Sequence, residues 1–183
     1  MKHVMLDLET LGTFPGASVI SVGAVQFDLD GSIGNTFHRN ISAASCRELG
    51  LLEDPATVEW WTKQSKEAQD RVTKEPKPVT AVVTEFNSWF MRSGCEFVWG
   101  NGATFDVTLW EAVCRKLSIA APWKFWNVRD MRTVIHLFDL DLRTMNRVGV
   151  HHDALDDAKF QVKCMAAALK KGLPVKQTAG VFA

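Results

Sequence analysis

Two carboxylates stand two positions apart near the start of the chain, Asp7 and Glu9. On a β-strand, side chains at positions i and i+2 point to the same face of the sheet. Two acids on a buried strand repel each other and are costly to remove from water. A divalent cation is the simplest counter-charge, because hard cations prefer carboxylate oxygens. The alternative is a strand face open to solvent that carries two ordinary acids, and the pair alone does not decide between them.

A third acid, Asp106, follows a short apolar segment at 96–100 and a Gly-Asn-Gly turn. It falls in the first turn of a helix that we expect over 104–117. A strand over 96–100 can lie beside the first strand, and functional sites in α/β sheets tend to form at such strand ends. Asp106 can therefore reach Asp7 and Glu9, although an acid in a first helical turn is also explained by the helix dipole.

A histidine pair followed by three aspartates opens the last long helical pattern of the chain. We expect a helix over 152–171, with His152 at its start and Asp157 a little over one turn later. Both side chains would then line one side of the first turns. Asp153 and Asp156 are expected to face solvent and to support the helix N-terminus.

The order of the strands and helices that must position these groups predicts an α/β fold with a mixed β-sheet. Strands over 18–27 and 33–41, joined by a hairpin turn, follow the strand at the N-terminus, so the chain should open as an antiparallel three-strand meander. The next residues, Ser42 to Gly50, form a short helix or loop. The remaining expected elements are a strand at 96–100 and helical patterns at 55–61, 63–77, 79–92, 104–117 and 152–171. Residues 126–130 are expected to lead into a further helix that runs through Leu140.

Composition sets the broad class. The 183 residues, 46% of them hydrophobic, predict one domain over 1–175 with a loose tail at 176–183. No apolar run is long enough to span a bilayer, so we expect no membrane partner. The four cysteines form no CxxC pair and predict free thiols in a cytoplasmic protein. The net charge of zero gives no global indication of nucleic-acid binding, although a basic rim around an acidic centre would be compatible with it.

Taken in order, three motifs resemble the DEDDh 3′–5′ exonucleases of the RNase H-like superfamily. They are Asp-Leu-Glu-Thr at 7–10, Asn-Gly-Ala-Thr-Phe-Asp at 101–106 and the pattern H-x-A-x-x-D at 152–157. The match spans the whole chain. The segment at 54–61, with the residues at 64–65, further resembles the small single-domain phage and bacterial branch, which includes a mycobacterial exoribonuclease and exonuclease VIII-like proteins. The resemblance implies an RNase H-like mixed sheet.

By this resemblance His152 is the general base, and two Mg²⁺ ions, or Mn²⁺ in their place, are held by Asp7, Glu9, Asp106 and Asp157. Two ions about 4 Å apart can clamp the attacking and leaving oxygens of a phosphodiester, and all-oxygen ligand sets suit Mg²⁺ and Mn²⁺. A histidine titrates near neutral pH and can take the proton of the attacking water. His151 is the rival base, but the family pattern falls on its neighbour.

In the relatives, the turn after the first acids holds the terminal nucleotide. Leu11 is a candidate wedge between bases, or it simply packs under the loop. Trp60 and Trp61 are 100° apart on one helix, so one belongs to the core and the other can stack on a base. We take Trp61 as the stacking residue. The candidate substrate-binding residues are therefore Thr10, Leu11, Gly12, Trp61, Phe105 and Arg132.

Several basic residues could contact phosphates or simply face solvent. Arg132 is the first choice, because it opens a helix between the third acid and the histidine. Asp130 beside it is expected to cap that helix or to orient a partner, and not to bind metal. The other candidates are Lys63, Lys66, Arg129, Arg143 and Arg147.

The expected function is metal-dependent 3′–5′ hydrolysis of single-stranded DNA or RNA with a free 3′ end, which releases nucleoside 5′-monophosphates. One alternative is a non-catalytic nucleic-acid-binding module, which the five filled catalytic positions argue against. Another is a proofreading-type subunit, for which the short segment after Gly172 leaves little room to dock a polymerase. Residue types do not choose between the two sugars, since that choice rests on contacts to the 2′-hydroxyl. A homodimer through exposed tryptophans is possible.

Overall fold

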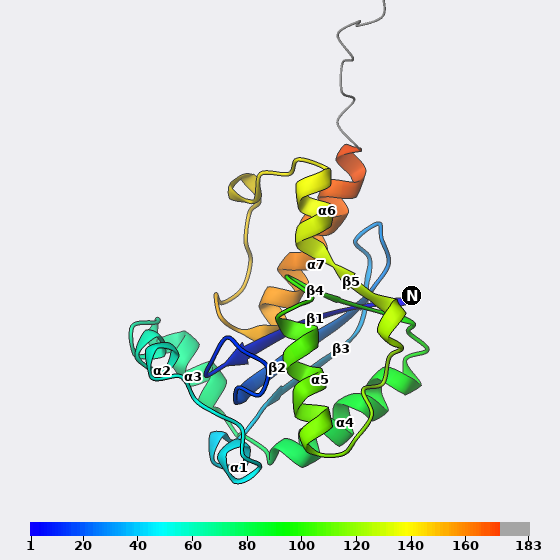
Figure 1. The fold of residues 1–183 in the computed structure, drawn as a ribbon. Coiled ribbons are helices and arrows are strands. Elements are labelled where there is room, and N and C mark those ends of the chain that lie inside the picture. Colours follow the sequence, from blue (N-terminus) through cyan, green and yellow to red (C-terminus); the bar gives the residue numbers. More distant parts are fainter. Residues whose placement is uncertain (173–183) are drawn as a thin grey trace, which may run out of the picture.

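The computed structural model describes residues 1–172, which contain one five-stranded mixed sheet in the order β3-β2-β1-β4-β5 (Figure 1). The central strand β1 is antiparallel to β2 and parallel to β4. The predicted antiparallel opening and the predicted pairing of β4 with β1 are therefore confirmed. The expected tail at 176–183 lies outside the described residues. The strands are β1 (His3–Thr10), β2 (Val19–Phe27), β3 (Ile33–Asn40), β4 (Phe97–Gly100) and β5 (Val128–Asp130).

Helices cover both faces of this sheet, as Figure 1 shows. The even-numbered side chains of β1 from Val4 to Leu8 pack with α4 and α5, whereas Met5 packs with α6 and α7. Asp7 and Glu9 share the parity of Met5, so the alternation of the strand directs both acids to the α7 face. The helices are α1 (Ala43–Glu48), α2 (Pro55–Thr62), α3 (Lys66–Thr73), α4 (Val79–Arg92), α5 (Asp106–Lys116), α6 (Met131–Leu137) and α7 (Ala154–Lys171), with 3₁₀ turns η1 (Phe125–Asn127) and η2 (Leu142–Thr144).

Local sequence signals explain most helix boundaries. The Asp54 side chain caps α2, and Pro55 stands at its first position, where a missing N–H costs nothing. The helix predicted over 63–77 is shorter, because Ser65 caps a new helix by accepting from Ala68 N at 3.2 Å. The predicted helix over 79–92 is confirmed.

Two expectations at the C-terminal side of the sheet are wrong. Residues 128–130, expected to lead into a helix, form the edge strand β5, in which Val128 pairs with Val98 of β4. Three residues are too few to show strand alternation. The last helix starts at Ala154 and not at His152, because Asp153 is its N-cap.

The N-terminus of α7 lies directly on the backbone of β2. A Cβ atom at Gly23 would meet the carbonyl carbon of Ala154 at 2.2 Å and Leu155 N at 2.3 Å, far inside van der Waals contact. Gly23 pairs with Asp7 on the neighbouring strand. The missing side chain therefore lets the helix approach the sheet at the position of the first acid.

Candidate active site

Asp7 and Glu9 are buried, with 9% and 6% of their surface exposed. A solvent-facing pair of ordinary acids is thereby excluded. Burial, followed by the charges of Asp106 and Glu9, raises the pKa of Asp7 well above its usual range. Burial, followed by the charges of Asp106 and Asp153, raises the pKa of Glu9 to about 8. The ionised forms of both carboxylates are therefore favoured only when a positive charge lies close to them.

Asp106 is the first residue of α5 and is 3% exposed. Its Oδ1 accepts a hydrogen bond from Leu8 N at 3.2 Å, which places this carboxylate against β1 between the two strand acids. Burial raises the pKa of Asp106 to about 7, although the backbone N–H groups of Leu8 and Asn101 oppose the shift. The turn after β4 thus brings the third acid to the strand end where the sequence predicts it.

His152 and Asp157 complete the group. One carboxylate oxygen each from Glu9 and Asp157 and one ring nitrogen of His152 lie within 4.8 Å of one another, close enough to share a metal ion. His152 precedes α7 with a φ of +65°, a conformation that side chains other than glycine rarely adopt. Such local strain is typical of residues that a functional site holds in place.

The near-neutral titration expected for His152 is wrong in this environment. Burial, then the charges of His151 and Arg147, lowers the pKa of His152 to about 4. Its ring is therefore uncharged at neutral pH and can accept a proton. His151 is exposed, and its ring lies 4.0 Å from that of His152, edge to face. The structure places His152, and not its neighbour, against Glu9 and Asp157.

Asp153 was expected to face solvent, and this is wrong: it is 3% exposed. Its Oδ1 accepts from the backbone N–H groups of Leu155 and Asp156, at 3.2 and 3.1 Å, so its expected support of the helix N-terminus is confirmed. Oδ2 pairs with Arg71 of α3 at 3.4 Å. Because α7 starts directly over the sheet, its cap is enclosed between the helix and α3. Asp156 is also partly buried, and it accepts from Val150 N at 3.0 Å.

Arg147 reaches the acids from the loop before α7. Its guanidinium contacts the carboxylate of Asp157 and lies 4.7 Å from the ring centre of Phe160. Its charge lowers the pKa values of Asp7 and Glu9, against the larger effect of burial. Sequence reasoning grouped this residue with basic residues of the surface, because nothing local distinguishes it from them.

Gln161 of α7 is a site residue that sequence reasoning missed. It is 4% exposed, and its Nε2 donates to Oδ1 of Asp7 at 2.5 Å. A signal was present, since Asp157 and Gln161 are four residues apart and share one helix face.

A pocket of about 400 Å³ adjoins the acids. Trp61 is one wall of it, but this ring is 7% exposed and its Nε1 donates to Thr10 O at 2.9 Å. Trp60 is 41% exposed and packs edge-on against His152, with 4.8 Å between ring centres. The choice of Trp61 as the freely accessible ring is therefore not supported, and Trp60 takes that place. The lining residues are Leu8, Glu9, Thr10, Thr13, Ala56, Thr57, Trp60, Trp61 and Phe105.

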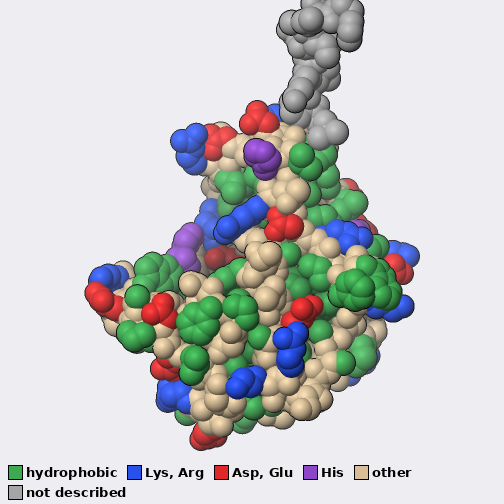
Figure 2. Space-filling view, viewed as in Figure 1, with side chains coloured by type: hydrophobic (Ala, Val, Ile, Leu, Met, Phe, Trp, Pro, Cys, Tyr) green, Lys and Arg blue, Asp and Glu red, His purple; other side chains and the backbone are tan. Residues whose placement is uncertain are grey.

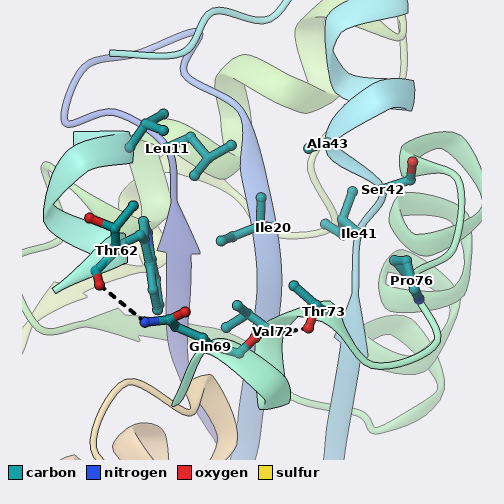
Figure 3. A pocket seen from close by; sticks show the side chains of 12 residues that line it. Leu11, Ile20, Ile41, Ser42, Ala43, Thr62, Gln69, Val72, Thr73 and Pro76 are labelled. Atoms are coloured by element: carbon teal, nitrogen blue, oxygen red, sulfur yellow. Dashed lines mark hydrogen bonds between the residues drawn. The ribbon is translucent and has the colours of Figure 1, made fainter. Parts of the chain in front are cut away.

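Leu11 lines a second, apolar pocket of about 390 Å³ on the other side of Trp61. Figure 3 shows that Ile20 and Val72 face the same space. Leu11 packs against this small cluster, in line with the simpler of its two expected roles. Gly12 is buried, and its carbonyl oxygen accepts from Thr10 Oγ1 at 2.8 Å, which closes the turn after β1.

Asp130 caps α6, as the sequence predicts, by accepting from Thr133 N at 2.7 Å. Its other oxygen accepts from Ala103 N at 2.7 Å, so the same side chain fixes the turn that leads to Asp106. Arg132 is exposed beside this turn, and its charge lowers the pKa of Asp106. It is thus placed on the rim of the acidic group.

The other basic candidates have local partners. Lys63 pairs with Glu59 at 2.6 Å and Arg143 with Asp141 at 2.9 Å. Arg129 lies over a phenyl ring at 4.7 Å. Figure 2 shows a histidine and acidic side chains in a recess at the left of the surface, beside the part of the surface that lies over α2.

The donor set fits divalent cations. The carboxylates of Asp7, Glu9, Asp106 and Asp157 offer oxygen ligands, which suit Mg²⁺ or Mn²⁺ better than softer metals. Burial raises the pKa values of Asp7, Glu9 and Asp106, and for Asp7 and Glu9 the neighbouring acids raise them further, against the opposing charge of Arg147. None of the helices within residues 1–172 combines the length and hydropathy needed to cross a bilayer.

Comparison with known proteins gives a consistent result. The sequence model of the 3′-5′ exoribonuclease Rv2179c-like domain matches residues 2–169. An exodeoxyribonuclease of Enterobacteria phage T4 is 25% identical over 205 aligned positions, which cover 93% of this chain and 90% of that protein. The nuclease domain of 3′hExo, a DEDDh family member bound to rAMP, superimposes with a TM-score of 0.64 at 14% identity and covers 93% and 92% of the two chains.

A second solved structure, E. coli exonuclease I in complex with a 5cy-dT13 oligonucleotide, superimposes with a TM-score of 0.66 at 16% identity. The match covers 93% of this chain but only 40% of exonuclease I. These structures share the mixed sheet with flanking helices, so the predicted RNase H-like α/β fold is confirmed.

Proposed function

The chain belongs to the 3′-5′ exoribonuclease Rv2179c-like family of DEDDh 3′–5′ exonucleases, and from this premise we propose that residues 1–175 form one catalytic domain for single-stranded substrates. It hydrolyses phosphodiester bonds from a free 3′ end of DNA or RNA and releases nucleoside 5′-monophosphates. The observation that carries the proposal is the meeting of Glu9, His152 and Asp157 within 4.8 Å, beside the buried Asp7 and Asp106.

Two divalent ions, Mg²⁺ or Mn²⁺, would be held by the carboxylates of Asp7, Glu9, Asp106 and Asp157. When bound, they supply Lewis-acid stabilisation of the charge that develops on the phosphate. Arg132 stands on the rim, where an incoming phosphate would pass. It offers a planar guanidinium that suits phosphate oxygens.

His152 is the general base. Its ring is uncharged at neutral pH, so a ring nitrogen can take the proton of the attacking water. The strained backbone at this residue and the edge-on contact with Trp60 hold the ring over the acids. A base that is fixed in this way loses little entropy in the reaction.

The pocket next to Glu9 accepts the terminal nucleoside. Phe105 and Trp60 offer aromatic surface for the base, and Thr10, whose hydroxyl donates to Gly12 O, lines the same pocket. Leu11 would support the turn after β1 by packing against Ile20 and Trp61. The choice between DNA and RNA would rest on contacts to the 2′-hydroxyl, for which Thr10, Thr13 and Thr57 of the pocket offer hydroxyl groups.

The test is degradation of 5′-labelled single-stranded DNA and RNA with Mg²⁺, with Mn²⁺ or with EDTA. A ladder that shortens from the 3′ end with either ion, and no shortening in EDTA, is the expected result. Asp7→Asn should abolish it, whereas Asp70→Asn, which changes an exposed acid on α3, should not. Binding of both polymers without cleavage under any metal would refute the proposal in favour of a non-catalytic module.

A further inference from the structure

Gln161 forms a direct hydrogen bond between the last helix and the first strand. Its Nε2 donates to Asp7 Oδ1 at 2.5 Å across 154 positions of sequence. Both partners are buried, at 4% and 9% exposure. A donor held this close to a carboxylate in a place that excludes water constrains the carboxylate strongly, since hydrogen bonds to ionised acceptors are short and strong.

The direction of this bond follows from chemistry. If the amide were reversed, Gln161 would turn its carbonyl oxygen toward a carboxylate oxygen of Asp7, and two acceptors would face each other. The assigned orientation is therefore the favourable one whenever Asp7 is ionised.

The other end of the amide has no comparable partner. Oε1 of Gln161 is buried and accepts no hydrogen bond from any residue in the described part of the chain. A buried polar atom without a partner costs free energy, and a methionine of similar size would avoid that cost. A glutamine that brings a cost to the fold therefore indicates a benefit elsewhere, and the neighbouring carboxylate is the group it touches.

The position of Gln161 on α7 gives it a second relation to the site. It follows Asp157 by four residues, so one helix face presents an acid of the site and a hydrogen-bond donor one turn later. The Gln161 side chain at this second position is uncharged. An amide can hold an acid there without competing with a cation, whereas a lysine or arginine would compete.

We propose that Gln161 is a positioning residue that holds the carboxylate of Asp7 through one oxygen, so that the other oxygen is presented to a divalent ion. This inference rests on the proposed function, because Asp7 must be a metal ligand for it to matter. The amide acts on the metal only through Asp7. It differs in this from Asp157, which offers its own oxygen to the site.

The experiment compares Gln161→Met with a matched control, Gln26→Met. Gln26 is also buried, at 8% exposure, but it pairs with Val4 toward the other end of β1 and donates to Ser93 O. For each variant, Mn²⁺ affinity is measured by calorimetry, the Mg²⁺ dependence of cleavage is recorded, and the Tm is measured in EDTA.

Gln161→Met should bind Mn²⁺ about 10- to 100-fold more weakly, as is common when the support of a metal ligand is removed. It should need correspondingly more Mg²⁺ for half-maximal cleavage, while kcat at saturating Mg²⁺ recovers to within about threefold of wild type. A purely structural role would instead lower the Tm in EDTA and leave the Mn²⁺ affinity of the folded protein unchanged. Wild-type affinity in Gln161→Met, or equal losses in Gln26→Met, would overturn the inference.

Gln161→Asn guards against a variant that does not fold. It keeps the amide but is one methylene shorter, so it should show the same weakened Mn²⁺ binding. Failure of the proposed function would be seen differently, as wild-type protein that binds Mn²⁺ but cleaves neither polymer. In that case the affinity of the two Gln161 variants still tests the positioning role.

Discussion

Gly23→Ala is the substitution for which the structure makes the sharpest prediction. The added Cβ would lie 2.2 Å from the carbonyl carbon and 2.3 Å from the carbonyl oxygen of Ala154. Both are backbone atoms, so no side-chain rotation relieves the clash. Ordinary contacts between carbon atoms are about 3.5–4.0 Å, so the start of α7 must move away from β2 by more than about 1 Å.

That movement carries Asp157 and Gln161 away from the acids of β1. A misplacement of about 1 Å at a catalytic group can cost about 100-fold in rate, and we expect a loss of kcat/KM of that order. Overpacking costs about 1–3 kcal/mol, which corresponds to a decrease in Tm of about 3–10 °C for a chain of this size. The substitution should therefore damage activity far more than folding.

The assay is kcat/KM on a labelled oligonucleotide with Mg²⁺, together with thermal unfolding followed by circular dichroism. Gly34→Ala is the matched control on β3 at the edge of the sheet, because its Cβ would meet side-chain atoms of Met1 and Gln26 and no backbone atom. It should stay within about threefold of wild type, as is usual for surface substitutions. If Gly23→Ala keeps wild-type activity and Tm, the close approach of α7 does not position the site.

Further predictions concern protons, the base and the base pocket. Glu9 and Asp106 have folded-state pKa values of about 8 and about 7, above their unfolded values, so the folded chain binds more protons between about pH 4 and 8. The free energy of unfolding in EDTA should therefore fall by on the order of a few kcal/mol as the pH rises through this window. Mg²⁺ should raise the Tm more at pH 8 than at pH 6. Thermal scans in both conditions check this, and a Tm independent of pH would contradict it. His152→Ala should lower kcat by about 100-fold or more with little change in Mn²⁺ affinity, whereas His151→Ala should stay active. If single-turnover rates show the reverse pattern, His151 and not His152 is the general base. Trp60→Ala should raise KM about 5- to 50-fold through the loss of stacking, with the folded state intact by circular dichroism, and an unchanged KM would remove this ring from the base pocket.

The strand acids and their partners could be predicted because the information is local. Two-residue alternation puts Asp7 and Glu9 on one face, and a turn after a parallel strand delivers Asp106 to the same end. The edge strand β5 could not be predicted, since three residues carry no periodicity. The order of the strands then follows from the hairpin and from the first helical crossover.

The rest depends on contacts between distant segments. Gln161 and Arg147 look like ordinary polar residues in sequence, and their proximity to Asp7 and Asp157 exists only once α7 is docked. The burial of Asp153 has the same origin, because it results from the place where α7 lies on the sheet. No local pattern reports the left-handed backbone of His152, which is imposed by the connection between that docked helix and the loop before it.

The bond between Asp7 and Gln161 joins β1 to α7, the first and last elements of the described residues. During synthesis β1, β2 and β3 can pair long before α7 emerges, so an unfinished chain carries Asp7, Glu9 and Asp106 without their partners from the last helix. Because the acids of β1 meet Asp157 and Gln161 only after α7 has docked on the sheet, the opening strands alone cannot assemble the site.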